Sequence, residues 1–285
     1  MTPTTPGADW SPLAPALLEP ALAGGLGALC LLALAASGRL RCVREEFASW
    51  PRRAAALLLL WGILSTTVFY ATVAPGDAMA IDTETLWFPS LFVAHALLAG
   101  FLLIWWALAH PQPLLRFLRL ETAAPGDFAF GLRVGVAGWA LALASGAVLA
   151  FVLTLFGWEG LSDADGVPGG ADLVPPLIAW LADLPLARKL LVIAIAMTVE
   201  EAFYRAFLQP RIGWIPSSLL FALSHAGYGL PTLMASVFTV SLVIGWAFRR
   251  NGSLLPCIVA HGFFDAVQLL VILPLVVGQM RAAAP

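Results

Sequence analysis

Apolar residues occur along the chain in runs of about 20, separated by short polar or proline-containing stretches. A helix of about 20 apolar residues is long enough to cross the hydrocarbon core of a bilayer. The pattern therefore predicts an all-α, polytopic membrane helix bundle with about eight transmembrane helices, of which the sixth is short. The expected spans are 17–37, 54–73, 87–109, 128–156, 187–208, 214–227, 230–248 and 254–277.

The composition agrees with a membrane protein and excludes an ordinary soluble domain. Hydrophobic residues make up 60% of the 285 residues, charged residues make up only 11%, and the mean hydropathy is +0.89. The lipid bilayer is the expected partner, and no nucleic acid is expected. The predicted organisation is an N-terminal tail (1–16), four N-terminal transmembrane helices (17–156), an acidic non-cytoplasmic loop (157–186) and a four-helix catalytic core (187–278).

Arginines and lysines predict which side of the membrane each loop faces, because cytoplasmic loops are enriched in them. The alternate loops that begin at residue 39 hold ten basic residues, whereas the opposite loops hold only Arg188 and Lys189, with Arg281 in the tail. The acidic loops fall on the basic-poor side. Both termini are therefore predicted to be non-cytoplasmic, and Arg188 and Lys189 are the one local conflict with this orientation.

Residues 198–205, inside the fifth expected span, break the apolar pattern with Glu200, Glu201 and Arg205. Each such charge costs roughly 2.5–3.5 kcal/mol at the centre of a bilayer, so a function for them is expected. Glu201 and Arg205 are four residues apart and can pair on one helix face. Glu200 is rotated from Glu201 by about 100° and is free to face another helix.

Further ionisable residues lie at a matching depth in other spans. At 1.5 Å per residue, Glu200, His225 and His261 each lie roughly 12–17 Å from the cytoplasmic face. Because isolated burial of such groups is costly, they are expected to meet. Asp265 lies four residues after His261 and can hold its imidazole in one tautomer. His95 lies in the third span, and we interpret it as a hydrogen-bonded core residue outside this group.

A carboxylate and two imidazoles in a sheltered cavity suit the activation of water. Glu200 can accept the proton, one histidine can orient the water, and another donor can stabilise an oxyanion. A zinc site is also open, because Glu200, His225 and His261 as ligands would leave a fourth position for water. No cofactor is certain, and Zn²⁺ is the one candidate. Ser224 lacks the G-x-S-x-G setting, H-E-x-x-H is absent, and the three cysteines are expected to be inert core thiols.

Three motifs follow one another in the last third of the chain: Glu200-Glu201-x-x-x-Arg205, Phe221-x-x-x-His225 and His261-x-x-x-Asp265. In this order they resemble the motifs of the CPBP family, the CAAX prenyl protease and bacteriocin-processing (Abi-type) group of intramembrane proteases. The resemblance covers about residues 187–278. It implies an eight-helix bundle with a conical cavity open toward the membrane and the cytoplasmic side.

The resemblance also implies an intramembrane endopeptidase. Its substrate would be a protein or peptide, membrane-anchored or with a C-terminal sorting tail, cut in or near its C-terminal or membrane part. By resemblance, Glu200 and His225 would activate water, and Glu201 and Arg205 would support the site. The residues leave open whether the mechanism is of the glutamate type or that of a metalloendopeptidase.

His261 with Asp265 would, by the same resemblance, bind or polarise the scissile carbonyl. Eukaryotic CAAX enzymes of this family have Asn where this chain has Asp265, whereas Asp is frequent among bacterial relatives. An ionised Asp accepts hydrogen bonds and cannot donate one to an oxyanion. Asp265 is therefore expected to orient His261 or ligate a metal. This favours a bacterial-type protease of the inner (plasma) membrane over an enzyme for prenylated CAAX proteins.

Two other classes of protein remain as alternatives. A non-catalytic bacteriocin self-immunity protein would carry the same family resemblance. An ion-coupled transporter would also keep carboxylates in the membrane, but it predicts helices interrupted by Gly or Pro at the site. Residues 198–207 contain neither Gly nor Pro, and the chain has no convincing internal repeat.

Overall fold

The computed structural model describes residues 13–72, 87–109, 112–157, 176–226 and 231–283, and within these ranges it contains helices and no strand. The predicted all-α, polytopic membrane helix bundle is thus confirmed. Residues 1–12 of the expected N-terminal tail and residues 158–175 of the expected acidic loop lie outside the described ranges.

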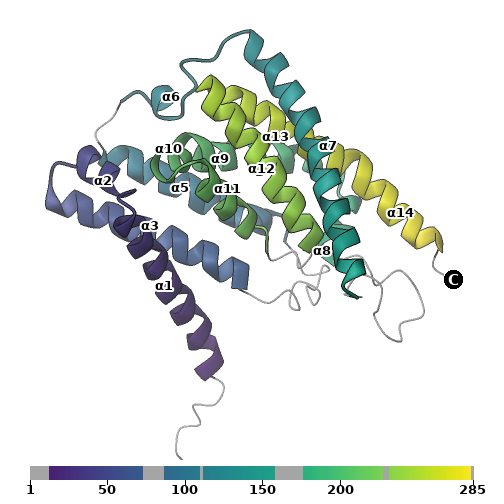
Figure 1. The fold of residues 1–285 in the computed structure, drawn as a ribbon, viewed down its shortest axis with the longest axis horizontal. Helices are drawn as coiled ribbons and strands as arrows, with labels where there is room; N and C mark the ends of the chain where they lie inside the picture. Colours follow the sequence, from purple (N-terminus) through teal and green to yellow (C-terminus); the bar gives the residue numbers. More distant parts are fainter. Residues whose placement is uncertain (1–12, 73–86, 110–111, 158–175, 227–230, 284–285) are drawn as a thin grey trace, which may run out of the picture.

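The N-terminal half of the chain forms long helices joined by short ones (Figure 1). The elements are α1 (Leu13–Ala36), α2 (Arg41–Glu46), α3 (Trp50–Thr72), the 3₁₀ helix η1 (Phe88–Phe92), α5 (Val93–Leu108), α6 (Leu114–Phe117) and α7 (Gly126–Leu155).

The C-terminal half contains two long helical runs, each with a π-helical segment inside it. The first run is α9 (Leu186–Glu201), the π segment η3 (Ala202–Leu208) and α10 (Gln209–Ile212). The second run is α13 (Leu255–Val267), the π segment η5 (Gln268–Ile272) and α14 (Leu273–Ala283). The other helices are α8 (Pro176–Asp183), α11 (Trp214–Leu223) and α12 (Pro231–Asn251).

Among the described residues, six helices are long and apolar enough to cross a membrane, and they correspond to six of the eight expected spans. They are Glu19–Ala36, Trp50–Phe69, Phe88–Leu108, Gly126–Leu155, Pro231–Asn251 and Leu255–Ala282. The fifth expected span lies in the continuous helical run Leu186–Ile212, which is long enough to cross a membrane but is excluded from this set by its charged residues, among them Glu200, Glu201 and Arg205. The sixth, α11, has ten residues, or about 15 Å, half the thickness of the hydrocarbon core. The expected count of eight spans is therefore not confirmed.

Helix α7 packs against both α12 and α13, and glycines make this close approach possible. A Cβ on Gly131 would lie 2.7 Å from the carbonyl oxygen of Pro256, and one on Gly135 would lie 3.0 Å from that of Ala260. In a bilayer, small residues four apart let two helix backbones approach, and van der Waals packing then replaces the missing hydrophobic driving force. Helix α13 is held in this way along one face.

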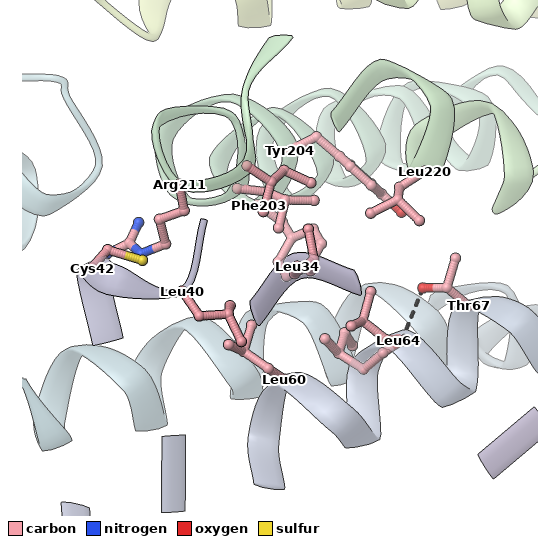
Figure 2. A pocket seen from close by; sticks show the side chains of 13 residues that line it. Leu34, Leu40, Cys42, Leu60, Leu64, Thr67, Phe203, Tyr204, Arg211 and Leu220 are labelled. Carbon is pink, nitrogen blue, oxygen red and sulfur yellow. Dashed lines mark hydrogen bonds between the residues drawn. The ribbon is translucent and has the colours of Figure 1, made fainter. Parts of the chain in front are cut away.

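Helices α1 and α3 pack along each other at one side of the bundle (Figure 1). Between this pair and the π segment η3 lies a cavity of about 20 Å³, which Figure 2 shows. Phe203 and Tyr204 of η3 line it from one side, and Leu60 and Leu64 of α3 line it from the other. Because the walls are mostly apolar and the volume is that of about one water molecule, we interpret it as a packing gap.

Helix α8 accounts for Lys189, one of the two residues that conflict with the predicted orientation. The apolar stretch 177–181, which forms most of α8, packs onto the bundle, where Leu181 contacts a cluster that includes Ile193 and Leu269. Lys189 is buried, and its Nζ donates a hydrogen bond of 2.7 Å to the carbonyl oxygen of Ala182. Its charge therefore serves the packing of α8, and it carries little information about membrane sidedness.

Candidate active site

The site centres on a cavity of about 260 Å³ in the C-terminal half of the molecule. Most of its lining is apolar and comes from η1, α8, α12 and the α13–η5–α14 run. Its ionisable lining residues come from four different elements of the chain. They are His95, Glu200, His225, His261 and Asp265. Glu200, His225 and His261 were expected to lie close together, and all three line this cavity. His95 lines it as well.

Glu201 and Arg205 form a fully buried ion pair next to the cavity. Arg205 Nε donates to Glu201 Oε2 at 2.9 Å, and both side chains have no exposed surface. Arg205 also donates from Nη2 to Ser241 Oγ of α12 at 3.0 Å. The other carboxylate oxygen, Glu201 Oε1, lies 2.9 Å from Nδ1 of His261 on α13. The predicted i,i+4 pair is therefore present, and it ties α9 to both α12 and α13.

His261 is surrounded by three carboxylates. Its closest partner is Glu201, whereas Asp265 Oδ2 lies 3.4 Å and Glu200 Oε2 lies 3.9 Å from its Nε2. Asp265 was expected to hold this imidazole. The shorter contact shows that Glu201 fixes Nδ1, so Nε2 is the nitrogen that faces the cavity carboxylates, and Asp265 is its second, looser partner.

His225 lies just beyond the end of α11, where the helix turns toward the cavity lining. Its Nδ1 lies 2.8 Å from the carbonyl oxygen of Phe221. A carbonyl only accepts, so Nδ1 carries the proton of this bond, and Nε2 of the neutral ring holds the lone pair. Ser224 donates its hydroxyl proton to the same carbonyl oxygen at 2.7 Å. This hydrogen bond does not orient the Ser224 hydroxyl as a nucleophile.

Phe221, the aromatic residue four positions before His225, contacts three of the motif residues. Its ring centroid lies 4.8 Å from that of His225 and 5.8 Å from that of His261. The guanidinium of Arg205 lies 5.2 Å from the same centroid, within range of a cation–π contact. One buried ring therefore packs against both histidines and the arginine.

Glu200 faces a histidine that the sequence interpretation had set apart. Its Oε1 lies 3.0 Å from Nε2 of His95 on α5, while its Oε2 has no hydrogen-bond partner in the part of the chain that the structure describes. His95 is hydrogen-bonded, as expected, but its separation from the motif residues was wrong. The available signal was an ionisable residue inside an apolar span, the same signal that identified the other site residues.

Both helical runs that carry site residues contain a π segment close to them. The segment η3 begins at Ala202, directly after Glu201, and includes Arg205, whereas η5 begins at Gln268, three residues after Asp265. A π segment adds a residue to a turn and leaves carbonyls with altered partners, and such segments are frequent at functional sites. In η3, Ser217 of α11 donates to the carbonyl oxygen of Tyr204 at 2.6 Å, which satisfies a buried acceptor.

The donors in the cavity do not form a metal-binding group. Among the residues with described positions, no three His, Cys, Asp or Glu side chains are grouped so that they could hold one metal ion. This includes Glu200, His225 and His261, the set considered for zinc, and one oxygen of Glu200 already contacts His95. The arrangement gives no support for a zinc site, and zinc dependence stays a prediction to be measured.

The comparison with known families agrees with the motifs. Residues 182–267 match the family described as Type II CAAX prenyl endopeptidase Rce1-like. The match contains all three motifs and leaves out His95 and the helices before residue 182. No curated protein and no solved structure matches the chain significantly. Residues 182–267 are therefore similar to the Rce1-like CAAX endopeptidase family, which is consistent with the CPBP group of intramembrane proteases.

Proposed function

We propose that this protein hydrolyses a peptide bond in or near the C-terminal or membrane part of a protein or peptide substrate, with Glu200 as general base. The observation that carries this proposal is the unpartnered carboxylate oxygen of Glu200. Glu200 lines the cavity, and its Oε2 is buried, has no hydrogen-bond partner among the described residues, and lies 3.9 Å from His261 Nε2. That distance is too long for a direct hydrogen bond, so the described side chains leave Oε2 available to accept a proton.

The neighbouring side chains supply the other parts of such a reaction. His225, with its lone pair on Nε2, orients the water that Glu200 deprotonates. His261, held through Nδ1 by Glu201, directs Nε2 toward the scissile carbonyl and polarises it. Asp265 supports His261 as an acceptor rather than donating to the oxyanion. The Glu201–Arg205 pair holds its own helical run against α12 and α13.

The cavity wall supports a substrate with an apolar segment. Leu91, Phe92, Ile178, Leu269 and Leu273 surround the polar groups. An extended or unwound membrane segment could bury its side chains there while its backbone reaches Glu200 and His261. We place the enzyme in a bacterial plasma membrane, which Asp265 favours by resemblance, with both termini non-cytoplasmic, as the loop charges predict.

The test compares cells that produce the wild-type chain with cells that produce Glu200→Gln, and mass spectrometry quantifies new C-termini in membrane proteins. Glu121→Gln is the matched control, because Glu121 forms an exposed ion pair with Arg116 far along the chain from the motifs. We expect trimmed C-termini in the wild type and in the control, and a loss of about 10²–10⁴-fold in Glu200→Gln, the usual contribution of a general base. Retention of these C-termini at equal protein abundance would exclude the hydrolase.

A metal assay separates the two mechanism classes. Active, purified protein with less than about 0.1 equivalents of zinc would exclude a metalloendopeptidase, because its open site needs one bound ion. One equivalent that is lost in both His225→Ala and His261→Ala would instead show that zinc occupies the cavity.

A further inference from the structure

His95 reaches the site from outside the family domain. It lies on α5, and 16% of its side chain is exposed. Its ring is held on both sides: Nδ1 lies 3.2 Å from the carbonyl oxygen of Leu91, and Nε2 lies 3.0 Å from Glu200 Oε1. The ring of Phe92 is tilted against it at 6.3 Å between centroids. A side chain with two hydrogen bonds and an aromatic neighbour has a fixed direction.

The two oxygens of Glu200 are in different situations as a result. The bond to His95 requires one proton between Nε2 and Oε1, whichever group carries it. Oε2 is buried without a partner among the residues that the structure describes, and it lies 3.9 Å from Nε2 of His261, which lines the same cavity as Glu200. The terminal torsion of a glutamate is broad and two-fold, so an unheld carboxylate samples many orientations.

We infer that His95 is a positioning residue: it holds Oε1 of Glu200 and thereby keeps Oε2 beside Nε2 of His261. This inference rests on the proposed function, because Oε2, whose place is set when Oε1 is held, is the oxygen that would accept the proton from water. A base must be within hydrogen-bond reach of that proton. Misplacement by about 1 Å can lower a rate by about 10²-fold, so a fixed carboxylate matters to the reaction.

The consequence is that the domain at residues 182–267 does not contain the whole site. Helix α5 packs against α9, which carries Glu200, and this contact brings His95 to the cavity. The third expected span therefore contributes to the chemistry as well as to anchoring in the membrane.

The test replaces His95 with two side chains of similar length and volume, Gln and Met, in the full-length protein. Only Gln keeps an N–H that can reach Oε1 of Glu200. The measured quantity is the initial rate at which trimmed C-termini appear in membrane proteins after induction, divided by the amount of folded protein. Leu103→Met, on the lipid-exposed side of α5, controls for the introduction of Met into this helix.

We expect His95→Met to lower the rate by roughly 10–100-fold, as for other residues that orient a functional group, and His95→Gln to restore it to within about 3-fold of the wild type. A residue that only fills space would give equal rates for Gln and Met. Equal rates, or a wild-type rate in His95→Met, would overturn the inference. His95→Leu provides a second donor-free side chain if the Met variant does not fold.

Glu200→Gln is measured in parallel to separate this inference from the proposed function. If Glu200→Gln is inactive while His95→Met and His95→Gln behave alike, only the positioning inference fails. If Glu200→Gln keeps the wild-type rate, the proposed hydrolysis fails, and the inference about His95 fails with it.

Discussion

Two regions of this molecule solve the problem of helix association in a membrane in different ways. Most of α1 lies on the surface of the bundle, since 11% of its apolar window is buried, against 39% for α12. The α1–α3 pair relies on close packing at small residues. A Cβ on Gly27 would lie 2.9 Å from Ser65 Cα, and Trp61 Nε1 donates to the carbonyl oxygen of Gly24 at 2.9 Å.

The motif-bearing helices use buried charge instead. Glu201 and Arg205 have no exposed surface, and their hydrogen bonds reach Ser241 and His261 on two other helices. Lipid tails are as apolar as leucine, so apolar area alone does not draw helices together in a bilayer. Packing is enough where a helix only anchors the protein, whereas a network that fixes the directions of several side chains is needed where chemistry takes place.

The largest expected effect comes from breaking the buried pair on one side. Arg205→Met leaves the Glu201 carboxylate buried without its cation. The loss of one partner of a buried pair costs about 3–5 kcal/mol, because the remaining charge keeps its desolvation penalty. We expect a correspondingly lower midpoint in a detergent unfolding titration, which measures the free energy of unfolding.

Arg116→Met provides the exposed counterpart, since Arg116 Nε lies 2.9 Å from Glu121 Oε2 with 63% of its side chain exposed. An exposed pair contributes about 0–1 kcal/mol. Combining Arg205→Met with Glu201→Gln removes the orphaned charge and should recover part of the loss. Equal costs for the buried and exposed arginines would contradict the distinction between the two regions.

The sequence predicted the local part of this site well. Spacing alone identified the Glu201–Arg205 pair, because residues four apart on a helix face the same side. Equal depth in three spans predicted that Glu200, His225 and His261 line one cavity, and they do. Depth within a span follows from counting residues, so it needs no knowledge of tertiary packing.

The rest depended on contacts that spacing does not encode. His95 meets Glu200 across 105 positions, and nothing local to α5 indicates which helix it faces. In a π segment, some backbone carbonyl oxygens accept hydrogen bonds from other helices, as that of Tyr204 does from Ser217. The apolar pattern of the sequence does not record such contacts, so it predicted an uninterrupted α-helix. The sequence also overestimated the sixth expected span, because α11 ends at Leu223.

A second prediction compares glycine contacts in the two regions. Gly27→Val and Gly131→Val each place a side chain against a neighbouring backbone, and overpacking of this kind costs about 1–3 kcal/mol. We expect both variants to unfold earlier. Only Gly131→Val should also lower activity per folded molecule, because α7 packs against α13, which carries His261.

Gly25→Val is the matched control for this pair, since a Cβ on Gly25 meets nothing within 4 Å. It should leave the free energy of unfolding within about 0.5 kcal/mol of the wild type, as surface substitutions usually do. A loss of activity in Gly27→Val as large as that in Gly131→Val would show that the α1–α3 pair positions the site, and the proposed division between anchoring and chemical regions would be wrong.

The smallest expected effect concerns an ion pair at the edge of the bundle. Arg281 donates two hydrogen bonds to Asp183, of 2.9 and 2.7 Å, and these hydrogen bonds lower the pKa of the Asp183 carboxyl. A lowered pKa means that the pair stabilises the folded state above the ordinary pKa of Asp and stops doing so as the pH falls through the lowered value. Both side chains are 55% exposed, so water and salt screen most of this effect.

Asp183→Asn should therefore lower the thermal midpoint at pH 7 by no more than roughly 2 °C, and 1 M salt should abolish the difference. The difference should also vanish in acid, below the lowered pKa, where the wild-type carboxyl is itself neutral. The measurement is thermal unfolding in detergent at both salt concentrations. A shift as large as that of Arg205→Met would mean that charge docks α8 onto α14, and that the edge of the bundle resembles the motif region more than the α1–α3 pair.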